Sequence, residues 1–563
     1  MTDSVSSTTT TTSSSSVSYS QNRNDFDTDA LVEAAVEAKL ARADTLETKV
    51  TTNETKIAAY EEMQTLLLAM QDSLQALRSD PSSTGQEDDV FLNRTGYLTS
   101  STTTAADTLL SVTVEDGTDL DSHTIEILRV ATVERLGGGT LSSRSAEAGL
   151  AGSFSLGTTL DGTTSSVDIT ITEDMSLDDI ADAINAETGT SGVKASVLQV
   201  SSDEYMLILT GSETAATIAL SDTSGGVLQE LGLIDENGDK ADVLQSAQSA
   251  IVEIDGVAIT RSSNEIDDAL DGITLTLYKA ETDNVLTLEV DHSLSDIKEQ
   301  IEALVEAYNA FRDFVVTNQT TTDDGTADSS AVLFGDSTLR DVSTALQDAL
   351  TASIGEESMA LLGLSFDEEN HLELDEDTLD DALLNSIDEI QALFAYTAET
   401  SSGNLTLLRH GDGPEAAEFT LDITVDADGT VTGVSVDGDT SLFTVSGSRI
   451  VGADGTDYEG LSFVFSGTSS QSIDVSITQG IADRMWQTVE AVADEYDGTL
   501  TTLVTELEDS NSDLETRIST IEANAERYRE YLLDKYARIE AKLSEAQSVL
   551  DLLEAMTNAD SED

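Results

Sequence analysis

An apolar stripe near the end of the chain constrains the fold more than any other feature. Its members recur in alternating steps of four and three residues, with one extra step of four, a stutter that locally unwinds a supercoil. At ~1.5 Å per residue the helix would be about 60 Å long and would leave its stripe wet unless another helix covered it. The stripe consists of Leu514, Ile518, Ile521, Ala525, Tyr528, Leu532, Tyr536, Ile539, Leu543, Ala546, Leu550 and Leu553.

A second stripe, near the start of the chain, is the natural partner. It follows a seven-residue repeat, although Asn53 and Gln64 interrupt it. Acidic cap candidates at Asp27 and Asp29 begin the helical block, and Asp80-Pro81 ends it. We therefore predict pairing of Leu46, Val50, Ile57, Tyr60, Leu67 and Leu74 with Ile518, Ile521, Tyr528, Leu532, Ile539 and Leu543.

The segments between the two stripes alternate in polarity and read mostly as strands. Two stretches, "VEIDGVAITRSSNEIDDALDGITLTLYKAETDNVLTLEVD" and "FTVSGSRIVGADGTDYEGLSFVFSGTSSQSIDVSITQ", share an order of strands that leads into a helix. A short helix should begin with Ser176 as cap and Asp179 three residues later. The expected fold class is multidomain α+β: a discontinuous, coiled-coil-like helical leg from both chain ends, with inserted antiparallel β-rich head domains.

These patterns predict five parts of the chain. The parts are a disordered Ser/Thr-rich tail (1–24), a helical terminal region and leg (25–95 with 481–563), two β-rich head domains (96–290), a helical part of the leg (291–396) and a β-rich insert (397–480). The insert and the heads should therefore be separate β modules carried by the helical leg.

Charge limits the possible partners. The chain has 109 acidic and 26 basic residues, a formal net charge of −83, which disfavours nucleic acid and anionic membrane surfaces. Six basic residues between Arg517 and Lys542 make the last helix less acidic; they could face the N-terminal helices, a neighbouring subunit or solvent. The lack of cysteine excludes disulfides and thiol chemistry, and we expect neither a secretory signal peptide nor a membrane span.

No pattern predicts catalysis, a metal site or a cofactor. The histidines, at positions 123, 292, 371 and 410, are far apart in sequence. The loops "VDADGT" and "DENGDKAD" share features with calcium loops but lack ligands at required positions. Trp486 is expected to anchor a helix in the core. We therefore expect a protein that is not an enzyme.

The order of motifs resembles the filament-capping family of flagellar hook-associated protein 2, the FliD family. The stretches that carry the resemblance are "DTDALVEAAVEAKL", "DGVAITRSSNEIDDALDGITLTL", "IEALVEAYNAF", "GDSTLRDV", "LLGLSFDEENHLELDEDTLDDAL" and "LETRISTIEANAERYREYLLDKYARIEAKL". Together they run from about residue 25 to residue 556. The Ser/Thr tail, the insert and the strong acidity depart from the family pattern.

The resemblance implies a ring-like homo-oligomeric cap at the tip of a bacterial flagellar filament, outside the cell, exported by the flagellar type III system. It implies partners in flagellin, the hook–filament junction protein and an export chaperone on the C-terminal helix. The extreme ends should pack only against such partners. These partner-binding residues are Leu31, Val32, Val36, Leu40, Leu550 and Leu553.

Three alternatives stay open on the sequence. A secreted or surface adhesin could carry β modules on a permanent coiled-coil stalk, and would not depend on flagellin. Another axial flagellar protein would also have helical ends around β domains, but its terminal sequences are not seen here. An enzyme is the most distant alternative.

Overall fold

The computed structural model describes residues 27–79, 88–411 and 413–559. The predicted tail (1–24) and Asp80-Pro81 lie outside these residues. The chain forms two compact units. The first contains the described residues up to Ala69, with Ala310–Thr344 and the residues from Thr488 onward; the second contains Met70–Asn309 and Ala345–Gln487. The expected α+β class, with helices from both chain ends and antiparallel sheets between them, is confirmed.

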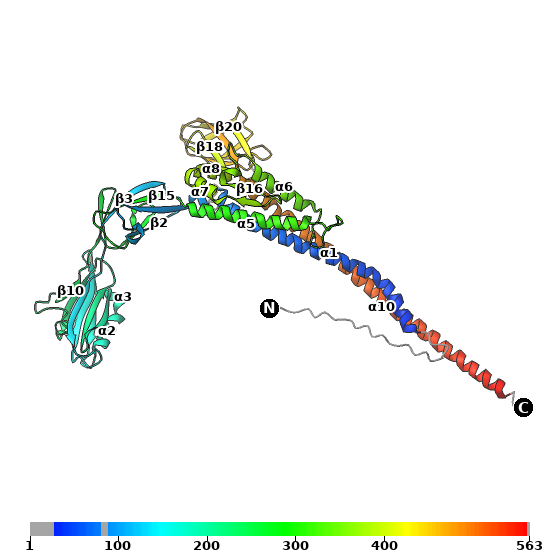
Figure 1. Ribbon diagram of the computed structural model, residues 1–563, viewed down its shortest axis with the longest axis horizontal. Helices are drawn as coiled ribbons and strands as arrows, with labels where there is room; N and C mark the ends of the chain where they lie inside the picture. Colours follow the sequence, from blue (N-terminus) through cyan, green and yellow to red (C-terminus); the bar gives the residue numbers. More distant parts are fainter. Residues whose placement is uncertain (1–26, 80–87, 412, 560–563) are drawn as a thin grey trace. The chain divides into compact units, whose positions relative to one another are not determined.

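Long helices build the first unit. The main two are α1 (Thr28–Leu77) and α10 (Thr499–Ala559), and Figure 1 shows them side by side. Asp27 is the residue that caps α1, because its Oδ1 accepts the N–H of Ala30 at 3.1 Å. Parts of three more helices belong to this unit: α5 (Leu294–Gln319), α6 (Ser337–Thr351) and α9 (Ile481–Ala493).

The first β region of the second unit has a five-stranded antiparallel sheet and a three-stranded one around a shared apolar core. The five-stranded sheet has the order β1-β15-β3-β11-β12 and the other the order β13-β14-β2. Their bounds are β1 (Arg94–Ser100), β2 (Leu110–Val114), β3 (Asp121–Arg129), β11 (Ala250–Ile254), β12 (Val257–Arg261), β13 (Glu265–Leu270), β14 (Ile273–Leu277) and β15 (Val285–His292). Two short 3₁₀ turns, η1 (Val90–Leu92) and η2 (Ala106–Thr108), accompany them.

Residues between β3 and β11 form a second β region with its own core. Its sheets have the orders β10-β4-β8-β7 and β6-β5-β9. The predicted capping box is confirmed: Ser176 Oγ accepts the N–H of Asp179, whose carboxylate accepts the N–H of Ser176. The elements are β4 (Arg135–Leu141), β5 (Gly152–Leu160), β6 (Thr163–Ile171), α2 (Leu177–Ala186), α3 (Thr188–Ser191), β7 (Val193–Ser201), β8 (Glu204–Gly211), β9 (Thr217–Ser224), α4 (Val227–Glu230) and β10 (Asp242–Gln245).

A third β region pairs two four-stranded sheets, β18-β25-β20-β21 and β19-β24-β23-β22, around an aromatic core. Phe443 lies at its centre, with ring centroids 5.0 Å from Tyr458 and 5.9 Å from Phe419. The strands are β18 (Tyr396–Thr400), β19 (Leu405–Arg409), β20 (Ala416–Val425), β21 (Val431–Val436), β22 (Phe443–Ser446), β23 (Arg449–Gly452), β24 (Ser462–Phe465) and β25 (Gln471–Gln479).

The predicted repeat is present in the order of elements but not in strand pairing. Each copy opens with a hairpin, β11–β12 or β22–β23, and ends with a strand that leads into a helix, β15 into α5 or β25 into α9. However, β23 pairs with β24, whereas β12 is the edge strand of its sheet.

A small helical segment precedes the third β region. It contains η3 (Met359–Leu362), the hairpin of β16 (Leu364–Phe366) and β17 (Leu372–Leu374), and two helices, α7 (Glu376–Asn385) and α8 (Ile387–Phe394). The apolar pattern of residues 375–395 would also suit one continuous helix. The structure divides it at Ser386, whose φ of −143° and ψ of 39° lie outside the helical region.

Candidate functional site

The candidate site is the antiparallel pair of α1 and α10 in the first unit. Three contacts fix its register: Gln64 Nε2 donates to Thr501 Oγ1 at 3.1 Å, Asn53 Nδ2 to Asn511 Oδ1 at 2.9 Å, and Thr28 Oγ1 to Glu540 Oε1 at 2.8 Å. As residue numbers fall along α1 they rise along α10, so the two helices run in opposite directions.

Apolar contacts hold together the part of the pair that lies near the start of α1. Val32 and Val36 of α1 are 2% and 6% exposed and pack against Ala525 and Leu532 of α10, which are 2% and 6% exposed. Burial of such side chains stabilises by roughly 1.5–3 kcal/mol for a fully buried residue. This cluster therefore belongs to the intramolecular core of the pair.

The two polar residues that interrupt the first stripe both have partners. Asn53 bonds to Asn511, and Gln64 donates to the carbonyl of Ala493 and to Thr501. Because an unpaired buried amide is costly, these bonds remove the penalty of placing polar residues in the stripe. A polar pair of this kind also fixes one register among those that the heptad pattern would allow.

Tyr60 of α1 contributes a further buried polar contact. Its hydroxyl donates to Asp336 Oδ2 at 2.7 Å, and the side chain is 5% exposed. Burial, with a smaller contribution from the nearby Asp336 carboxylate, raises the pKa of Tyr60 well above its usual range. The phenol is thus held in its neutral, hydrogen-donating form.

The pair ends where α1 begins, and α10 continues beyond it. Figure 1 shows the red end of α10 past the blue start of α1. We call residues 499–540 of α10 the paired segment and residues 541–559 the exposed end. From residue 541 to residue 553 every side chain is exposed. The large apolar side chains of the exposed end are Leu543, Val549, Leu550, Leu552, Leu553 and Met556, with exposed fractions of 45–63%.

The predicted pairing residues thus lie in different surroundings. Those that are buried are Leu46, Tyr60, Leu67, Leu74 and Leu532, and those that are half-buried are Val50, Ile57, Ile518, Ile521 and Tyr528. Ile539 and Leu543 differ from the prediction, because they are 41% and 45% exposed. Ile539 lies beside the first turn of α1, which starts at Thr28 next to Glu540, and Leu543 lies beyond that start.

The predicted partner-binding ends also require correction. Val32 and Val36 are buried inside the pair and Leu40 packs against them, so these three are not available only to a partner. The sequence stripe missed them because the helix pair extends further toward the start of the chain than residue 46. Leu31, Leu550 and Leu553 are 44%, 59% and 52% exposed.

Basic residues of α10 make only weak contacts with α1. Arg529 lies 3.7 Å from Glu33, and Lys39 of α1 lies 4.4 Å from the ring centroid of Tyr528. Arg538 pairs within its own helix, with Asp534 at 2.7 Å. Exposed pairs of this kind contribute about 0–1 kcal/mol, so charge is not what joins the helices.

Acidic loops in the second unit are held by their own backbone. Asp426 accepts N–H groups of Asp428 and Thr430, as expected for a strand-connecting turn. In the other suggested calcium loop, N–H groups of Asp239 and Asn237 bond to Asp235 and lower the pKa of its carboxyl group. These carboxylates stabilise their turns by accepting backbone N–H groups.

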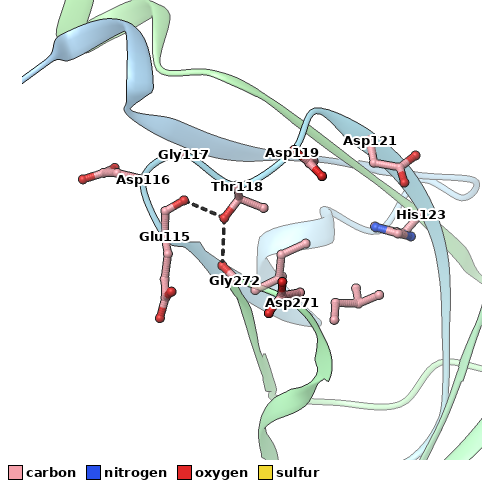
Figure 2. Close-up of a pocket in the computed structure, with 11 residues that line it drawn as sticks. Glu115, Asp116, Gly117, Thr118, Asp119, Asp121, His123, Asp271 and Gly272 are labelled. Carbon is pink, nitrogen blue, oxygen red and sulfur yellow. Dashed lines mark hydrogen bonds between the residues drawn. The ribbon is translucent and has the colours of Figure 1, made fainter. Parts of the chain in front are cut away.

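One acidic hollow and one mixed cluster were not anticipated. A hollow of about 450 Å³ has a lining that includes Glu115, Asp116, Asp119, Asp121 and Asp271, and Figure 2 shows these residues. Thr118 Oγ1 donates to the carbonyl of Glu115 at 2.7 Å and lies 3.4 Å from the carbonyl of Gly272 (Figure 2). Elsewhere, Asp367, Glu369 and His371 bring ligand atoms within 4.8 Å of one another.

The Asp367 cluster is a turn between β16 and β17. Asp367 Oδ1 accepts the N–H groups of Glu369 and His371, both at 2.8 Å, and these backbone bonds contribute to lowering the pKa of Asp367. His371 Nδ1 lies 3.2 Å from Asp367 Oδ2. Hydrogen bonding of the turn accounts for this arrangement without a metal.

A buried charged group surrounds Trp486, which is half-buried rather than fully in the core. The Arg78 guanidinium lies 3.8 Å from the Trp486 ring centroid and its Nε is 3.3 Å from Asp483 Oδ1. Gln479 Nε2 donates to Asp483 Oδ2 at 2.7 Å. Asp483 is fully buried, so these contacts compensate its lost hydration.

Across the described residues, no helix combines the length and apolar character needed to cross a bilayer.

Comparison with known families covers both ends of the chain. The family described as the flagellar hook-associated protein 2 C-terminus matches residues 247–548, more than half of the chain, and the corresponding N-terminus family matches residues 24–134. A flagellin hook IN motif matches residues 153–213, within the second β region.

Individual relatives agree with these family matches. The flagellar hook-associated protein 2 of Salmonella typhimurium is 34% identical over 218 residues, 37% of this chain and 46% of the relative. That of Escherichia coli is 28% identical over 324 residues, 55% of this chain and 69% of the relative. The chain thus spans about half the length of the first of these relatives.

A solved structure gives a weaker likeness. The D1-D2-D3 domains of the flagellar cap protein FliD from Escherichia coli are 29% identical, covering 60% of this chain and 90% of that one, with a TM-score of 0.42.

Proposed function

The chain belongs to the flagellar hook-associated protein 2 family, and from that premise we propose that it caps the tip of a bacterial flagellar filament. There it promotes the folding and polymerisation of flagellin at the growing end, as a ring-like homo-oligomer. The role is structural, with no catalytic step. The observation that carries the proposal is the match of both family regions, in order, over residues 24–134 and 247–548.

The exposed end of α10 supports a mechanism for this function. An exposed apolar helix face in water is unfavourable and is typical of a surface that a partner covers. We propose that Leu31, Leu550 and Leu553 bind flagellin or the hook–filament junction protein, and that an export chaperone covers the C-terminal helix before assembly. Export through the flagellar type III channel and a place outside the cell belong to the same proposal.

Deletion of the gene in its own host tests the proposal. Loss of the cap should give short or absent filaments, with monomeric flagellin released into the medium, as seen by electron microscopy and by an assay of the medium. Restoring the intact gene should restore filaments. Normal filaments with lost attachment to surfaces would contradict the cap and support an adhesin.

A further inference from the structure

A groove of about 350 Å³ runs along one side of the α1/α10 pair. Its floor is formed by Val50 and Ile518, which are half-buried although they belong to the two apolar stripes. The polar Thr51 and Ser519 are too small to fill it. Four carboxylates rim the groove: Glu47, Glu54, Glu515 and Glu522.

The rim is negative on both helices. In each helix the two glutamates are seven residues apart, with the apolar floor residue between them. Among the ion pairs of the described residues, none involves these four carboxylates. Like charges on facing helices repel, so a ligand for this groove needs an apolar side chain flanked by cations.

The same chain carries that pattern elsewhere on α10. Lys535, Ile539 and Lys542 occupy positions i, i+4 and i+7, and therefore lie on one helix face. All three are exposed, and Ile539 is a predicted pairing residue that the start of α1 leaves 41% exposed. Within the described chain neither lysine takes part in an ion pair.

A chain cannot fill its own groove with this face. Ile518 and Ile539 belong to one uninterrupted helix, and 21 residues at ~1.5 Å each separate them by roughly 30 Å. The face must therefore come from another molecule if it is to reach the groove. We propose that the Lys535–Ile539–Lys542 face of one copy docks into the groove at Val50 and Ile518 of a second copy.

The contact joins two different surfaces. If each copy offers its groove to one neighbour and its basic face to another, the interface is heterologous and builds a ring or an open array, whereas reciprocal docking of two copies would close a twofold dimer. It deepens the proposed ring-like oligomer, and in that sense rests on the proposed function, by assigning part of the subunit contact to the helix pair. It also gives a role to two basic residues of α10, Lys535 and Lys542, that take part in no ion pair within the described chain.

Disulfide cross-linking tests the contact directly, because the chain has no cysteine of its own. Full-length Ser519→Cys and Ile539→Cys chains, carrying tags of different size, are mixed at high concentration and oxidised. A mixed disulfide should form. The matched control replaces Ile539→Cys by Ala537→Cys, an exposed position about 160° around the helix. Equal yields from both mixtures, or no disulfide in either, would overturn the proposal.

Charge reversal gives a second, independent measurement. Lys535→Glu with Lys542→Glu in the Ile539→Cys chain should lower the yield about tenfold, because attraction at the rim becomes repulsion. Glu515→Lys with Glu522→Lys in the Ser519→Cys chain should restore it. An unchanged yield in the first mixture, or no recovery in the second, would contradict the docking. A basic helix from another protein as the true occupant would show as no disulfide between copies.

The cross-linking result tests the contact between copies independently of the proposed cap function. Cross-linking is measured on purified chains and requires neither flagellin nor filament growth. If disulfides fail to form while gene deletion shortens filaments, the cap stands and only the contact between helix pairs is rejected.

Discussion

The paired segment and the exposed end of α10 share one helix and one heptad-like stripe but differ in what covers that stripe. In the paired segment Leu532 is 6% exposed, whereas Leu550, on the same stripe, is 59% exposed. The only change between them is the presence of α1, which begins at Thr28 beside Glu540. A regular apolar stripe therefore predicts that a helix face is covered, but it does not predict whether the covering helix belongs to the same chain or to a partner.

The largest effect should come from Leu532→Asp. Placing a carboxylate against Val32 and Val36 should destabilise the pair by about 3–5 kcal/mol, because the charge would be buried without a partner. Hydrogen exchange over residues 525–540 measures this local loss better than a whole-chain melt, since a chain with several cores does not unfold in one step. Leu543→Asp, in the exposed end, should change it by less than about 0.5 kcal/mol.

Equal protection in the Leu532→Asp and Leu543→Asp variants would remove the distinction between the two segments. It would mean that the pair opens so readily that Leu532 gains nothing from α1. Motility should be lost in the Leu532→Asp variant under the cap proposal.

A smaller effect is expected at the polar layer. Asn511→Leu should cost about 1–3 kcal/mol, since Asn53 would keep a partly buried amide with no acceptor. The double variant Asn53→Leu with Asn511→Leu should recover much of this loss, because two apolar side chains can pack without unmet hydrogen bonds. Hydrogen exchange in the residues around Asn53 and Asn511 compares the two single variants, Asn53→Leu and Asn511→Leu, with the double variant. A double variant that loses the sum of both single losses would contradict a direct pair.

Alkaline pH should weaken the first unit through Tyr60, whose hydroxyl donates to Asp336. The folded protein holds the phenolic proton more tightly than the unfolded chain, whose tyrosine pKa is about 10. Its contribution is therefore present below pH ~10 and is lost as the pH rises toward the higher folded pKa. Tyr60→Phe should make the fall in stability above pH ~10 less steep. Tyr531→Phe is the matched control, because Tyr531 is 59% exposed, and an equal effect there would refute the role of burial.

The sequence predicted the helices at both ends because a heptad stripe is a direct record of burial along a helix. The capping box at Ser176 could likewise be predicted, since it depends on two residues that are three positions apart in sequence. Local patterns of this kind need no knowledge of distant contacts.

Local patterns could not predict where the pairing of α1 with α10 ends. Ile539 and Val32 have similar apolar character, and only the start of α1 at Thr28 decides that the first is exposed and the second buried. The break at Ser386 and the different pairing of β12 and β23 likewise depend on neighbours far along the chain. The groove at Ile518 needed both helices to be placed, because its rim comes from two segments more than 450 residues apart.

The smallest effect on stability should come from Leu550→Asp with Leu553→Asp, although this variant should abolish filament growth. Both side chains face solvent, so hydrogen exchange in the paired segment should change by less than about 0.5 kcal/mol. Filament length by electron microscopy should nevertheless fall, because carboxylates would enter the proposed contact with flagellin or the junction protein. Ser544→Asp with Ser548→Asp adds the same charge near the opposite helix face and should leave filaments intact. If filaments were of normal length in both variants, the exposed apolar face would have no part in assembly. The apolar stripe of α10 would then serve only to pack against α1 within the chain.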